Sequence, residues 1–388
     1  MNSPIMPTYG RQEIAFVKGE GSWLIDSKGN RYLDALSGIA VMVLGHSNPA
    51  ITRAITEQSS ELIHTSNLYR IPNQEKLAGQ LQAISGMDNM FFANSGAEAN
   101  ECAIKIARLH GHKKKIENPV IIVADSAFHG RTLATLTATG NRKVHAGFEP
   151  LVDGFVRVPF NDIEAVKNVA ENNKSVVAIF VEPVQGEGGI RIPNIHYLKE
   201  LRNICDQKDW LLMLDEIQTG YGRTGTFFSY QNYDVTPDIA TLAKGLGNGV
   251  PIGVCLAKGK ASELMQPGNH GSTFGGNPLV CHVASAVLDE IERQKLPERA
   301  SQLGLRMKKT FEDRIGSLNI VREIRGIGLM FGIELNEPCS HLVGKALEKK
   351  LLINVTAGNV IRLLPPLTIT DAEADQICEL VSQLIEGR

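Results

Sequence analysis

Short apolar runs alternate with amphipathic stretches through the middle of the chain. Three of these runs are VIIVAD at 120–125, VVAIFVEP at 176–183 and LLMLDE at 211–216. Each is rich in apolar residues and ends in an acid or a turn, which is typical of strands that are buried on both faces. Between the last two runs, helical spacing is kept by Ile195, Leu198, Leu201 and Ile204. The pattern predicts a strand-helix-strand unit in a mostly parallel sheet that is covered by helices.

The pattern changes after about residue 290. A long amphipathic stretch containing Leu303, Met307 and Phe311 is followed by an alternating, glycine-punctuated segment at 320–335, a short apolar run at 360–370 and a final helical pattern. We therefore expect an α/β fold, with a smaller α+β domain beside the large one.

The expected division has three parts. Residues 1–50 form an N-terminal segment that packs with the small domain, residues 51–285 form the large domain, and residues 286–388 form the C-terminal small domain. Within the first part, residues 22–36 read as a β-hairpin whose turn is supplied by residues 26–30. From its pattern alone this hairpin could join either domain.

Composition narrows the class of protein. A chain of 388 residues, 43% of them hydrophobic, can bury more than one core, which agrees with two domains. Forty basic and 42 acidic residues give a formal charge of −2, so a nucleic-acid or membrane partner is not expected. Six dispersed cysteines without a C-x-x-C pair favour buried thiols, no metal site and a reduced compartment. The N-terminus lacks a signal-peptide pattern, so we expect a cytoplasmic protein.

Residues 220–225 spell G-x-G-x-x-G after an apolar run, which raises the alternative of an NAD-dependent dehydrogenase. A dinucleotide site needs a helix directly after that turn, but residues 226–238 are aromatic and turn-rich, without helical periodicity. The acids that precede the turn are stronger candidates for chemistry. Asp215 and Glu216 lie at a strand end, and we expect Asp215 to face the ligand crevice while Glu216 caps or pairs elsewhere.

Lys244 ends another apolar run and precedes a turn with Gly245, Gly247 and Gly249, which we expect to leave room beside the amine. Desolvation lowers the pKa of an amine, and such a lysine becomes a nucleophile or Schiff-base former. A strand-end aspartate near this lysine suits pyridoxal 5'-phosphate (PLP), because the carboxylate keeps the pyridine nitrogen protonated while the lysine carries the cofactor and moves a proton. A phosphate cradle is offered by the turn of Ser95, Gly96 and Ala97, which precedes a predicted helix.

Several motifs occur together and cover nearly the whole chain. They include NSGAEANECAIKIAR, FHGRT, VEPVQGEGGI, LDEIQTGYGRTG, TLAKGLGNGVPIG and GSTFGGNPL. In this order they resemble the class III PLP-dependent aminotransferases of fold type I, most closely those members that act on N2-acetyl-L-ornithine. The resemblance implies that residues 51–285 bind PLP, and that the enzyme works by a ping-pong reaction.

The resemblance also assigns cofactor contacts. Lys244 would hold PLP covalently and move the proton, and Asp215 would pair with the pyridine nitrogen. Gln218 would lie beside the ring hydroxyl and Phe128 would stack on the ring. Gly96 and Ala97 would offer amides to the phosphate, although the family often has Thr at the position of Ala97.

Further residues are implied for substrate and assembly. Thr273 would reach the phosphate of a neighbouring subunit's cofactor, which implies a homodimer with shared active sites. Ser272 and Arg131 would contact the substrate. Arg362 would bind the α-carboxylate of glutamate, and Glu187 would neutralise Arg362 when an acylated ornithine is bound.

The implied reaction converts N2-acetyl-L-ornithine and 2-oxoglutarate to N-acetyl-L-glutamate 5-semialdehyde and L-glutamate, in arginine biosynthesis. Ornithine, succinylornithine, succinyl-diaminopimelate and 4-aminobutyrate remain alternative amino donors, and a non-catalytic dimeric scaffold is a further alternative. Arg70 stands where the family has Tyr or an uncharged residue, near the expected pocket entrance. We expect His129 to be a packed, hydrogen-bonded core residue.

Overall fold

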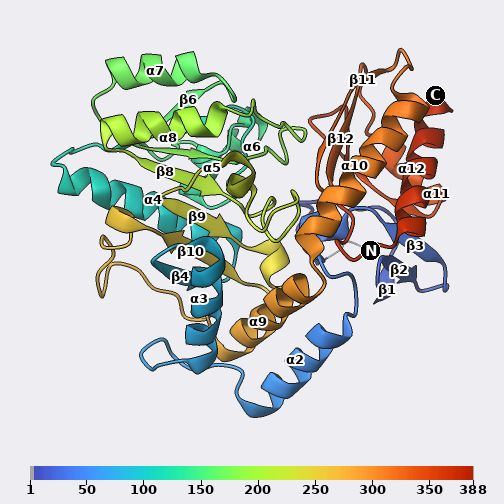
Figure 1. Cartoon of the computed structure of the whole chain (residues 1–388), viewed down its shortest axis with the longest axis horizontal. Helices are drawn as coiled ribbons and strands as arrows, with labels where there is room; N and C mark the ends of the chain where they lie inside the picture. The colour runs from blue at the N-terminus through green and yellow to red at the C-terminus, as the bar shows by residue number, and fades with distance from the viewer. Residues whose placement is uncertain (1–3, 388) are drawn as a thin grey trace.

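The computed structural model describes residues 4–387, so the outermost residues of the first and last expected domains, 1–3 and 388, lie outside the described residues. These residues form three β-sheets (Figure 1). The largest has seven strands in the order β4 (Asn89–Ala93), β10 (Gly253–Ala257), β9 (Ile239–Leu242), β8 (Leu211–Asp215), β7 (Val176–Val181), β5 (Val120–Ala124) and β6 (Phe155–Val158). Only β10 runs antiparallel to its neighbours.

The three apolar runs that predicted buried strands are β5, β7 and β8, and they lie side by side. The α/β fold with a mostly parallel sheet is therefore confirmed. The helices of this part are α3 (Pro72–Ser85), α4 (Gly96–Lys113), α5 (Leu133–Ala138), α6 (Arg142–His145), α7 (Ile163–Asn172) and α8 (Tyr197–Lys208).

Alternation along β8 explains how both faces of the sheet are covered. Leu211 and Met213 pack in one apolar cluster with residues of α4, whereas Leu212 and Leu214 pack in another with residues of α8. Every residue of β8 is buried, as expected for a strand between two helical layers.

The prediction for Ile195 is wrong. Helix α8 begins only at Tyr197, and the Ile195 side chain is 58% exposed. The side chain of Asn194 accepts a hydrogen bond from the His196 amide at 3.0 Å, and the Asn194 carbonyl accepts one from the Tyr197 amide at 3.0 Å. This turn breaks the helical repeat before Tyr197, so Ile195 lies outside the apolar face.

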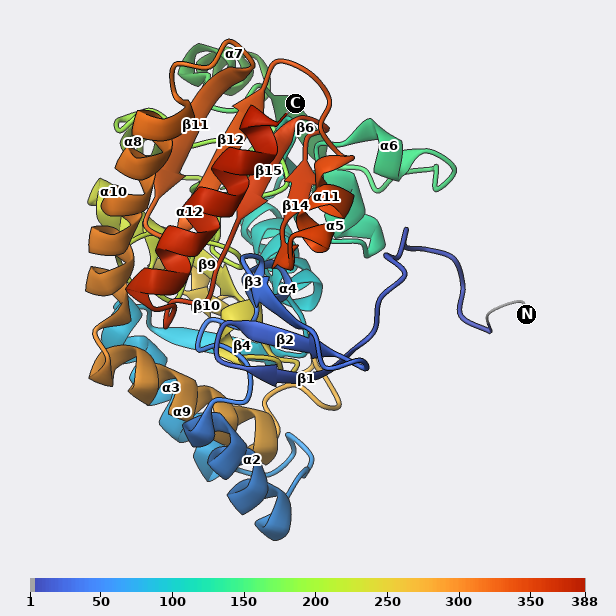
Figure 2. The ribbon, with the colours of Figure 1, turned by 90° about the vertical axis from the view of Figure 1, so that its right-hand side faces the viewer.

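The C-terminal sheet is antiparallel throughout (Figure 2). Its strand order is β11 (Val321–Ile327), β12 (Met330–Leu335), β15 (Val360–Leu363) and β14 (Asn354–Thr356). The helices of this part are α10 (Leu296–Ile315), α11 (Leu342–Glu348) and α12 (Asp371–Glu386). Leu303, Met307 and Phe311 are buried on α10, as their spacing predicted.

The N-terminal hairpin joins a strand from the other end of the chain. The third sheet consists of β1 (Phe16–Glu20), β2 (Trp23–Asp26), β3 (Arg31–Asp34) and β13 (Leu351–Leu352), and β3 is parallel to β13. Trp23 also donates to Glu373 of α12 at 2.6 Å. These contacts support the expected packing of residues 1–50 with the small domain, and we keep the three domain boundaries as a proposal.

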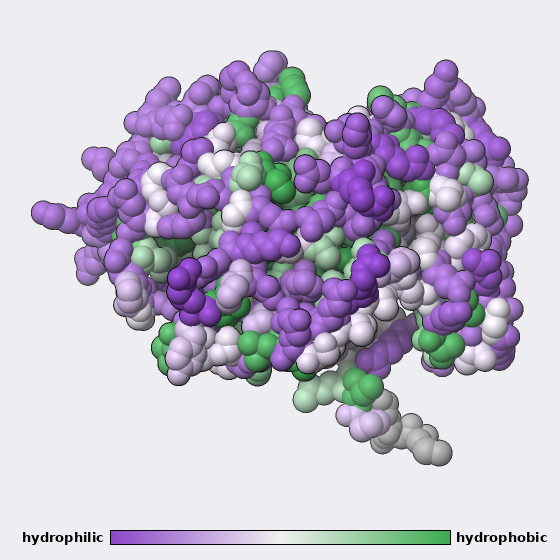
Figure 3. All heavy atoms as spheres, turned by 60° about the horizontal axis from the view of Figure 1, so that its bottom comes forward, coloured by the Kyte–Doolittle hydropathy of each residue, from purple (hydrophilic) through white to green (hydrophobic). Residues whose placement is uncertain are grey.

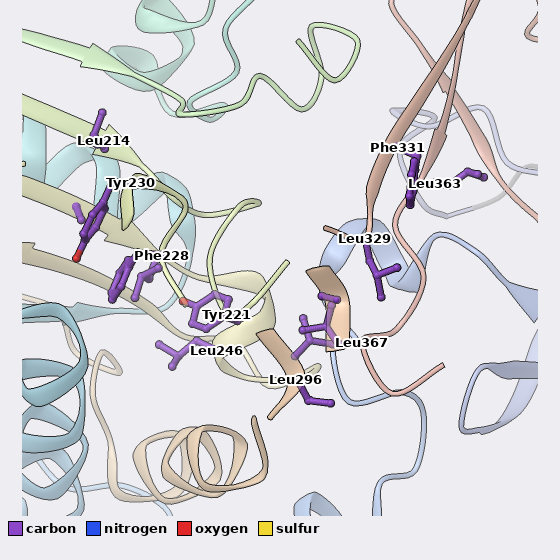
Figure 4. Packing of buried hydrophobic residues seen from close by; sticks show 14 of the residues in the cluster. Leu214, Tyr221, Phe228, Tyr230, Leu246, Leu296, Leu329, Phe331, Leu363 and Leu367 are labelled. Atoms are coloured by element: carbon purple, nitrogen blue, oxygen red, sulfur yellow. The ribbon is translucent and has the colours of Figure 1, made fainter. Parts of the chain in front are cut away.

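The remaining elements are short or lie outside the groups described so far. They are α1 (Ser37–Ala40), α2 (Pro49–Glu61), α9 (Pro278–Arg293) and the short 3-10 helices η1 (Ser229–Tyr233), η2 (Lys244–Leu246) and η3 (Gly259–Ala261). Helix α9 packs against α2 and α3. One apolar cluster runs from the large sheet to the C-terminal sheet, with Tyr221, Leu246, Leu296 and Leu367 between them (Figure 4).

All six cysteines are buried and none forms a disulfide, which confirms the prediction of buried thiols. Among the described residues, no helix is long and apolar enough to cross a membrane, and no group of three or more His, Cys, Asp or Glu side chains is placed to hold a metal. On the face shown in Figure 3, hydrophobic residues lie in small groups among hydrophilic ones.

Two helical glycines give a test of packing. A methyl group at Gly304 of α10 would lie 2.1 Å from the Gly328 carbonyl oxygen, whereas one at Gly79 of α3 would meet nothing within 4 Å. We expect Gly304→Ala to lower the free energy of unfolding by about 1–3 kcal/mol, because the contact is with backbone. Gly79→Ala should raise it by about 0.5–1 kcal/mol through helix propensity. Chemical denaturation checks both, and equal effects would contradict the packing account.

Candidate active site

A cavity of about 410 Å³ lies at the carboxyl ends of the central strands. Ligands of open α/β sheets bind at this edge. Eight residues that the sequence singled out line this one cavity: Ser95, Gly96, Ala97, Phe128, Arg131, Asp215, Gln218 and Lys244. The other four, Glu187, Ser272, Thr273 and Arg362, are not among its lining residues.

Asp215 ends β8 and is only 4% exposed. Its Oδ2 accepts a hydrogen bond from Asn100 Nδ2 at 2.8 Å and pairs with His129 Nδ1 at 2.8 Å, and its Oδ1 accepts from the Ile217 amide at 3.1 Å. Thr241 of β9 in turn donates to Asn100 Oδ1 at 2.6 Å. The carboxylate is therefore held in one orientation by α4 and by the segments after β5 and β8, with β9 supporting Asn100, as a buried charge requires.

Sequence reasoning missed Asn100 and understated His129. His129 is packed as expected, since its ring stacks on Phe180 with the centroids 4.1 Å apart. It also contacts the candidate catalytic carboxylate, and its Nε2 is buried without a hydrogen-bond partner among the described residues. Asn100 sits on the buried face of α4, and its polar side chain at a core position was a signal that could have been used.

Lys244 starts η2 with a positive φ of 42°, an uncommon backbone conformation for a residue with a side chain. Its side chain is half-buried and lines the cavity. Burial lowers the pKa of the amine, and the negative charge of Asp215 opposes that effect. A lysine with a lowered pKa holds a larger fraction of neutral, nucleophilic amine near neutral pH.

The glycines beside Lys244 serve a different purpose from the one expected. A methyl group at Gly245 would lie 2.7 Å from Val43 Cγ1, and one at Gly247 would lie 1.9 Å from the Val250 carbonyl oxygen. Only Gly249 lines the cavity. Gly245 and Gly247 therefore allow the turn to pack closely on its own neighbours and do not open space next to the amine.

A second strand-end acid, Glu182, also lines the cavity and was not singled out from the sequence. It follows β7, next to Asp215 at the end of β8. Its carboxylate accepts hydrogen bonds from the amides of Phe128 at 3.0 Å and Gly186 at 3.1 Å. Burial, and then the charge of Asp215, raise the pKa of Glu182 to about 8. The VEP sequence after a predicted strand was the available signal.

Glu216 points away from the cavity, as expected. It accepts hydrogen bonds from the amides of Ser229 at 3.0 Å and Tyr230 at 2.9 Å, and from the Thr219 hydroxyl. Burial raises the pKa of Glu216 to about 7. Its role is to hold the loop that follows β8.

The G-x-G-x-x-G turn is structural. The next element in the described chain is the 3-10 helix η1, so the turn does not open the α-helix of a dinucleotide site. Arg223 within the turn is fully buried, and its Nη1 donates to the carbonyls of Leu329 at 3.0 Å and Pro365 at 2.6 Å. The turn therefore joins the large sheet to the C-terminal part of the chain.

The amino end of α4 faces the same cavity. Ser95 caps this 18-residue helix by accepting a hydrogen bond from the Glu98 amide at 3.2 Å, and Gly96 and Ala97 form its first turn. The first amides of a helix have no intrahelical partner and attract anions. With an amine, a carboxylate and the Phe128 ring in one cavity, these residues fit a phosphorylated pyridine aldehyde such as PLP.

Arg362 lies close to the cavity but is fully buried in β15. Its Nη1 pairs with Glu187 Oε1 at 2.5 Å and lies 3.4 Å from Gln218 Oε1, which lines the cavity. Its Nε donates to Asn354 at 3.0 Å, and its Nη2 is left without a partner among the described residues. The structure therefore joins the two residues that the resemblance paired.

The remaining candidates lie near the surface. Arg131 is exposed, with its guanidinium carbon 5.7 Å from the centre of the Phe128 ring. Ser272 and Thr273 line a separate cavity of about 730 Å³, although Ser272 accepts a hydrogen bond from Asn94 of the first cavity at 3.1 Å. Arg70 forms a two-pronged ion pair with Glu75, with both bonds at 2.8 Å.

Nearly the whole chain is similar to known proteins. The family model of class III aminotransferases matches residues 6–385. Acetylornithine aminotransferase of Nitrosomonas europaea is 58% identical over 383 residues, covering 99% of this chain and 98% of that protein. The structure of ornithine aminotransferase from Toxoplasma gondii has a TM-score of 0.95 at 32% identity, covering 99% of this chain and 93% of that one. Acetylornithine aminotransferase from Elizabethkingia anophelis has a TM-score of 0.88 at 34% identity, covering 98% and 96%.

The raised pKa of Glu182 predicts a pH dependence of stability. The folded pKa of about 8 exceeds the ordinary value of 4.5, so the folded protein binds the extra proton, and stability falls as pH rises from about 4.5 to 8. Glu182→Gln removes this loss. We expect its melting temperature, relative to wild type, to increase between pH 5 and pH 8.5 in scanning calorimetry of the cofactor-free protein. Glu171→Gln, at an exposed position of α7, is the control. A pH-independent difference for Glu182→Gln would contradict the account.

Proposed function

Because the chain belongs to the class III aminotransferases, we propose that it transfers the δ-amino group of N2-acetyl-L-ornithine to 2-oxoglutarate in a ping-pong reaction. The products would be N-acetyl-L-glutamate 5-semialdehyde and L-glutamate, a step of arginine biosynthesis. The chain is a PLP-dependent enzyme, as its family is. The observation that carries the proposal is that Lys244, Asp215 and the amino end of α4 meet in one cavity.

PLP, when bound, supplies an electron sink for the pair left when a proton leaves the amino-bearing carbon. Asp215 would face the pyridine nitrogen, and its bonds to Asn100 and His129 would keep the carboxylate in place. Gly96 and Ala97 would donate amides to the phosphate, with Ser95 capping their helix. Phe128 and Gln218 would contact the ring and its hydroxyl.

The Nζ atom of Lys244 would have two functions. It would bond covalently to PLP and, once released, would take up and return the substrate proton. The lowered pKa supports both, because a neutral amine is needed to attack a carbonyl and to accept a proton. The positive φ of Lys244 sets the direction in which its side chain leaves the backbone, at the start of the turn after β9.

Two arginines would select the substrate. Arg131 is exposed at the cavity and would bind a carboxylate that enters from solvent. Ser272, which is hydrogen-bonded to Asn94 of the same cavity, would also contact the substrate. Arg362 would bind the α-carboxylate of glutamate through its planar fork. Its pairing with Glu187 supports a gate in which Glu187 neutralises Arg362 whenever an acylated ornithine occupies the site.

We propose a homodimer with shared active sites. The chain exposes several large apolar side chains near the second cavity and on the neighbouring segments: Leu62, Ile63, Leu68, Tyr69 and Phe274. Thr273 lines that cavity and would reach the phosphate of the partner's cofactor. Burial of such side chains would stabilise the dimer. Six buried cysteines without a disulfide suit a cytoplasmic location, which we also propose.

The amino donor is tested by steady-state turnover. The assay compares acetylornithine, succinylornithine, ornithine, 4-aminobutyrate and succinyl-diaminopimelate with 2-oxoglutarate as acceptor. We expect the highest kcat/KM with acetylornithine. A higher value with free ornithine would move the assignment toward the activity of the Toxoplasma gondii relative.

Replacing the central amine tests the catalytic assignment. We expect Lys244→Ala to lower kcat by at least about a thousandfold, because both covalent attachment and proton transfer are lost. The variant should also lose the visible absorbance band of the wild-type holoenzyme. Lys258→Ala, an alteration at the end of β10 away from the cavity, is the matched control and should keep both. Transamination that survives in Lys244→Ala would exclude the assignment.

Removing the carboxylate of Glu187 tests the gate. Without it, Arg362 is a buried cation lacking its partner, so the carboxylate of glutamate should bind more favourably. We expect Glu187→Ala to raise kcat/KM for glutamate relative to acetylornithine by roughly tenfold. The two half-reactions are measured separately in single-turnover experiments, and an unchanged ratio would refute the gate.

A further inference from the structure

The loop that carries Glu187 is pinned along its backbone. Gln185 and Arg191 form an antiparallel bridge with two hydrogen bonds of 3.0 Å, which closes the loop at its base. The Gly186 amide donates to Glu182 at 3.1 Å, and the Thr356 hydroxyl donates to the Glu187 carbonyl. The part of the loop at Gly186 and Glu187 is thus fixed by contacts from two separate segments.

The part of the loop at Gly189 and Ile190 is held by one guanidinium. Arg325 of β11 is only 6% exposed, and its Nε donates to the carbonyls of Gly189 at 3.0 Å and Ile190 at 2.9 Å. Its Nη2 donates to the Gly189 carbonyl as well, at 2.7 Å. A planar fork can bridge two successive carbonyls in this way, whereas an ammonium acts as a single point charge.

The Arg325 side chain is itself held by carboxylates of the C-terminal sheet. Its Nη1 pairs with Glu334 of β12 at 2.7 Å and with Glu323 of its own strand. Glu334 is 2% exposed and also pairs with Arg191 at 3.0 Å and with Arg322 at 3.2 Å. The guanidinium therefore has little freedom to leave the loop, and the loop is tied to the C-terminal sheet.

The loop has little room to move as a body. A methyl group at Gly188 would lie 2.7 Å from the Ser126 carbonyl oxygen, and Gly189 has a φ of +104°, which favours glycine. In contrast, the Glu187 side chain is 36% exposed. The part of the loop that can turn is thus the carboxylate that pairs with Arg362, while the backbone stays in place.

We propose that Arg325 is a positioning residue for substrate choice: by holding the Gly189 and Ile190 carbonyls, it keeps Glu187 within reach of Arg362. This inference rests on the gate in the proposed function. Arg325 does not touch the cavity, so it acts only through the loop. Without it, Glu187 pairs less well with Arg362, and the enzyme shifts toward glutamate as Glu187→Ala does.

The test is a double-mutant cycle between positions 325 and 187. We expect Arg325→Lys to raise the ratio of kcat/KM for glutamate over acetylornithine by roughly threefold to tenfold in the wild-type background. In the Glu187→Ala background the same change should alter the ratio by less than about twofold, because its target is gone. Single-turnover half-reactions of the holoenzyme give each ratio, and cofactor absorbance should be unchanged.

Arg322→Lys is the matched control, because Arg322 pairs with the same Glu334 but is 67% exposed and does not bond to the loop. It should leave the ratio unchanged. If Arg325→Lys fails to fold, Arg325→Gln, which keeps one donor, takes its place. An unchanged ratio in the wild-type background, or an equal change in both backgrounds, would overturn the proposal. If the wild type does not use acetylornithine, the proposed function fails, and the cycle is run with the ω-amino donor that it does accept.

Discussion

The structure depends on holding a buried carboxylate, Asp215, and a half-buried amine, Lys244, in one cavity. Charges in such a place are costly unless each is compensated. Asp215 is compensated by hydrogen bonds from Asn100 and His129, which come from α4 and from the segment after β5. The Lys244 amine is compensated in another way, since burial lowers its pKa and favours the neutral form. The large sheet brings these groups together because parallel strands end at one edge.

A second constraint acts where the two larger sheets meet. Glu187 and Arg362 are 175 positions apart in sequence but form a close ion pair beside the cavity. Arg223 and Arg325 are also buried at this junction and donate to backbone carbonyls across it. Arginine suits this task because its planar fork reaches several acceptors. Substrate choice therefore depends on contacts between the two parts of the chain.

Much of the fold followed from periodicity. Buried strands, a covering helix and the hairpin of residues 22–36 were predictable because their apolar spacing is local. The failure at Ile195 has a local cause too, a turn at Asn194 that hydropathy does not register. The position of Asp215 at a strand end also predicted that this acid faces the ligand. The position of Lys244 before a glycine-rich turn predicted that its amine acts together with Asp215.

The rest of the site could not be read from local pattern. Asn100 and Glu182 had only weak local signals, a polar residue on a buried helix face and an acid after a strand, and their importance comes from partners on other elements, such as Asp215 and the Phe128 amide. Arg362 and Glu187 were paired only through the resemblance, since no spacing rule links residues so far apart. The glycines after Lys244 were expected to leave room beside the amine, but Gly245 and Gly247 instead let the turn pack closely on Val43 and Val250.

The most direct test of the central claim is borohydride reduction of the PLP-loaded enzyme, followed by peptide mapping with mass spectrometry. The account predicts that the pyridoxyl group is found on the peptide containing Lys244, at close to one per chain. A label on another lysine, or no stable label after reduction, would contradict the claim that this amine holds the cofactor opposite Asp215.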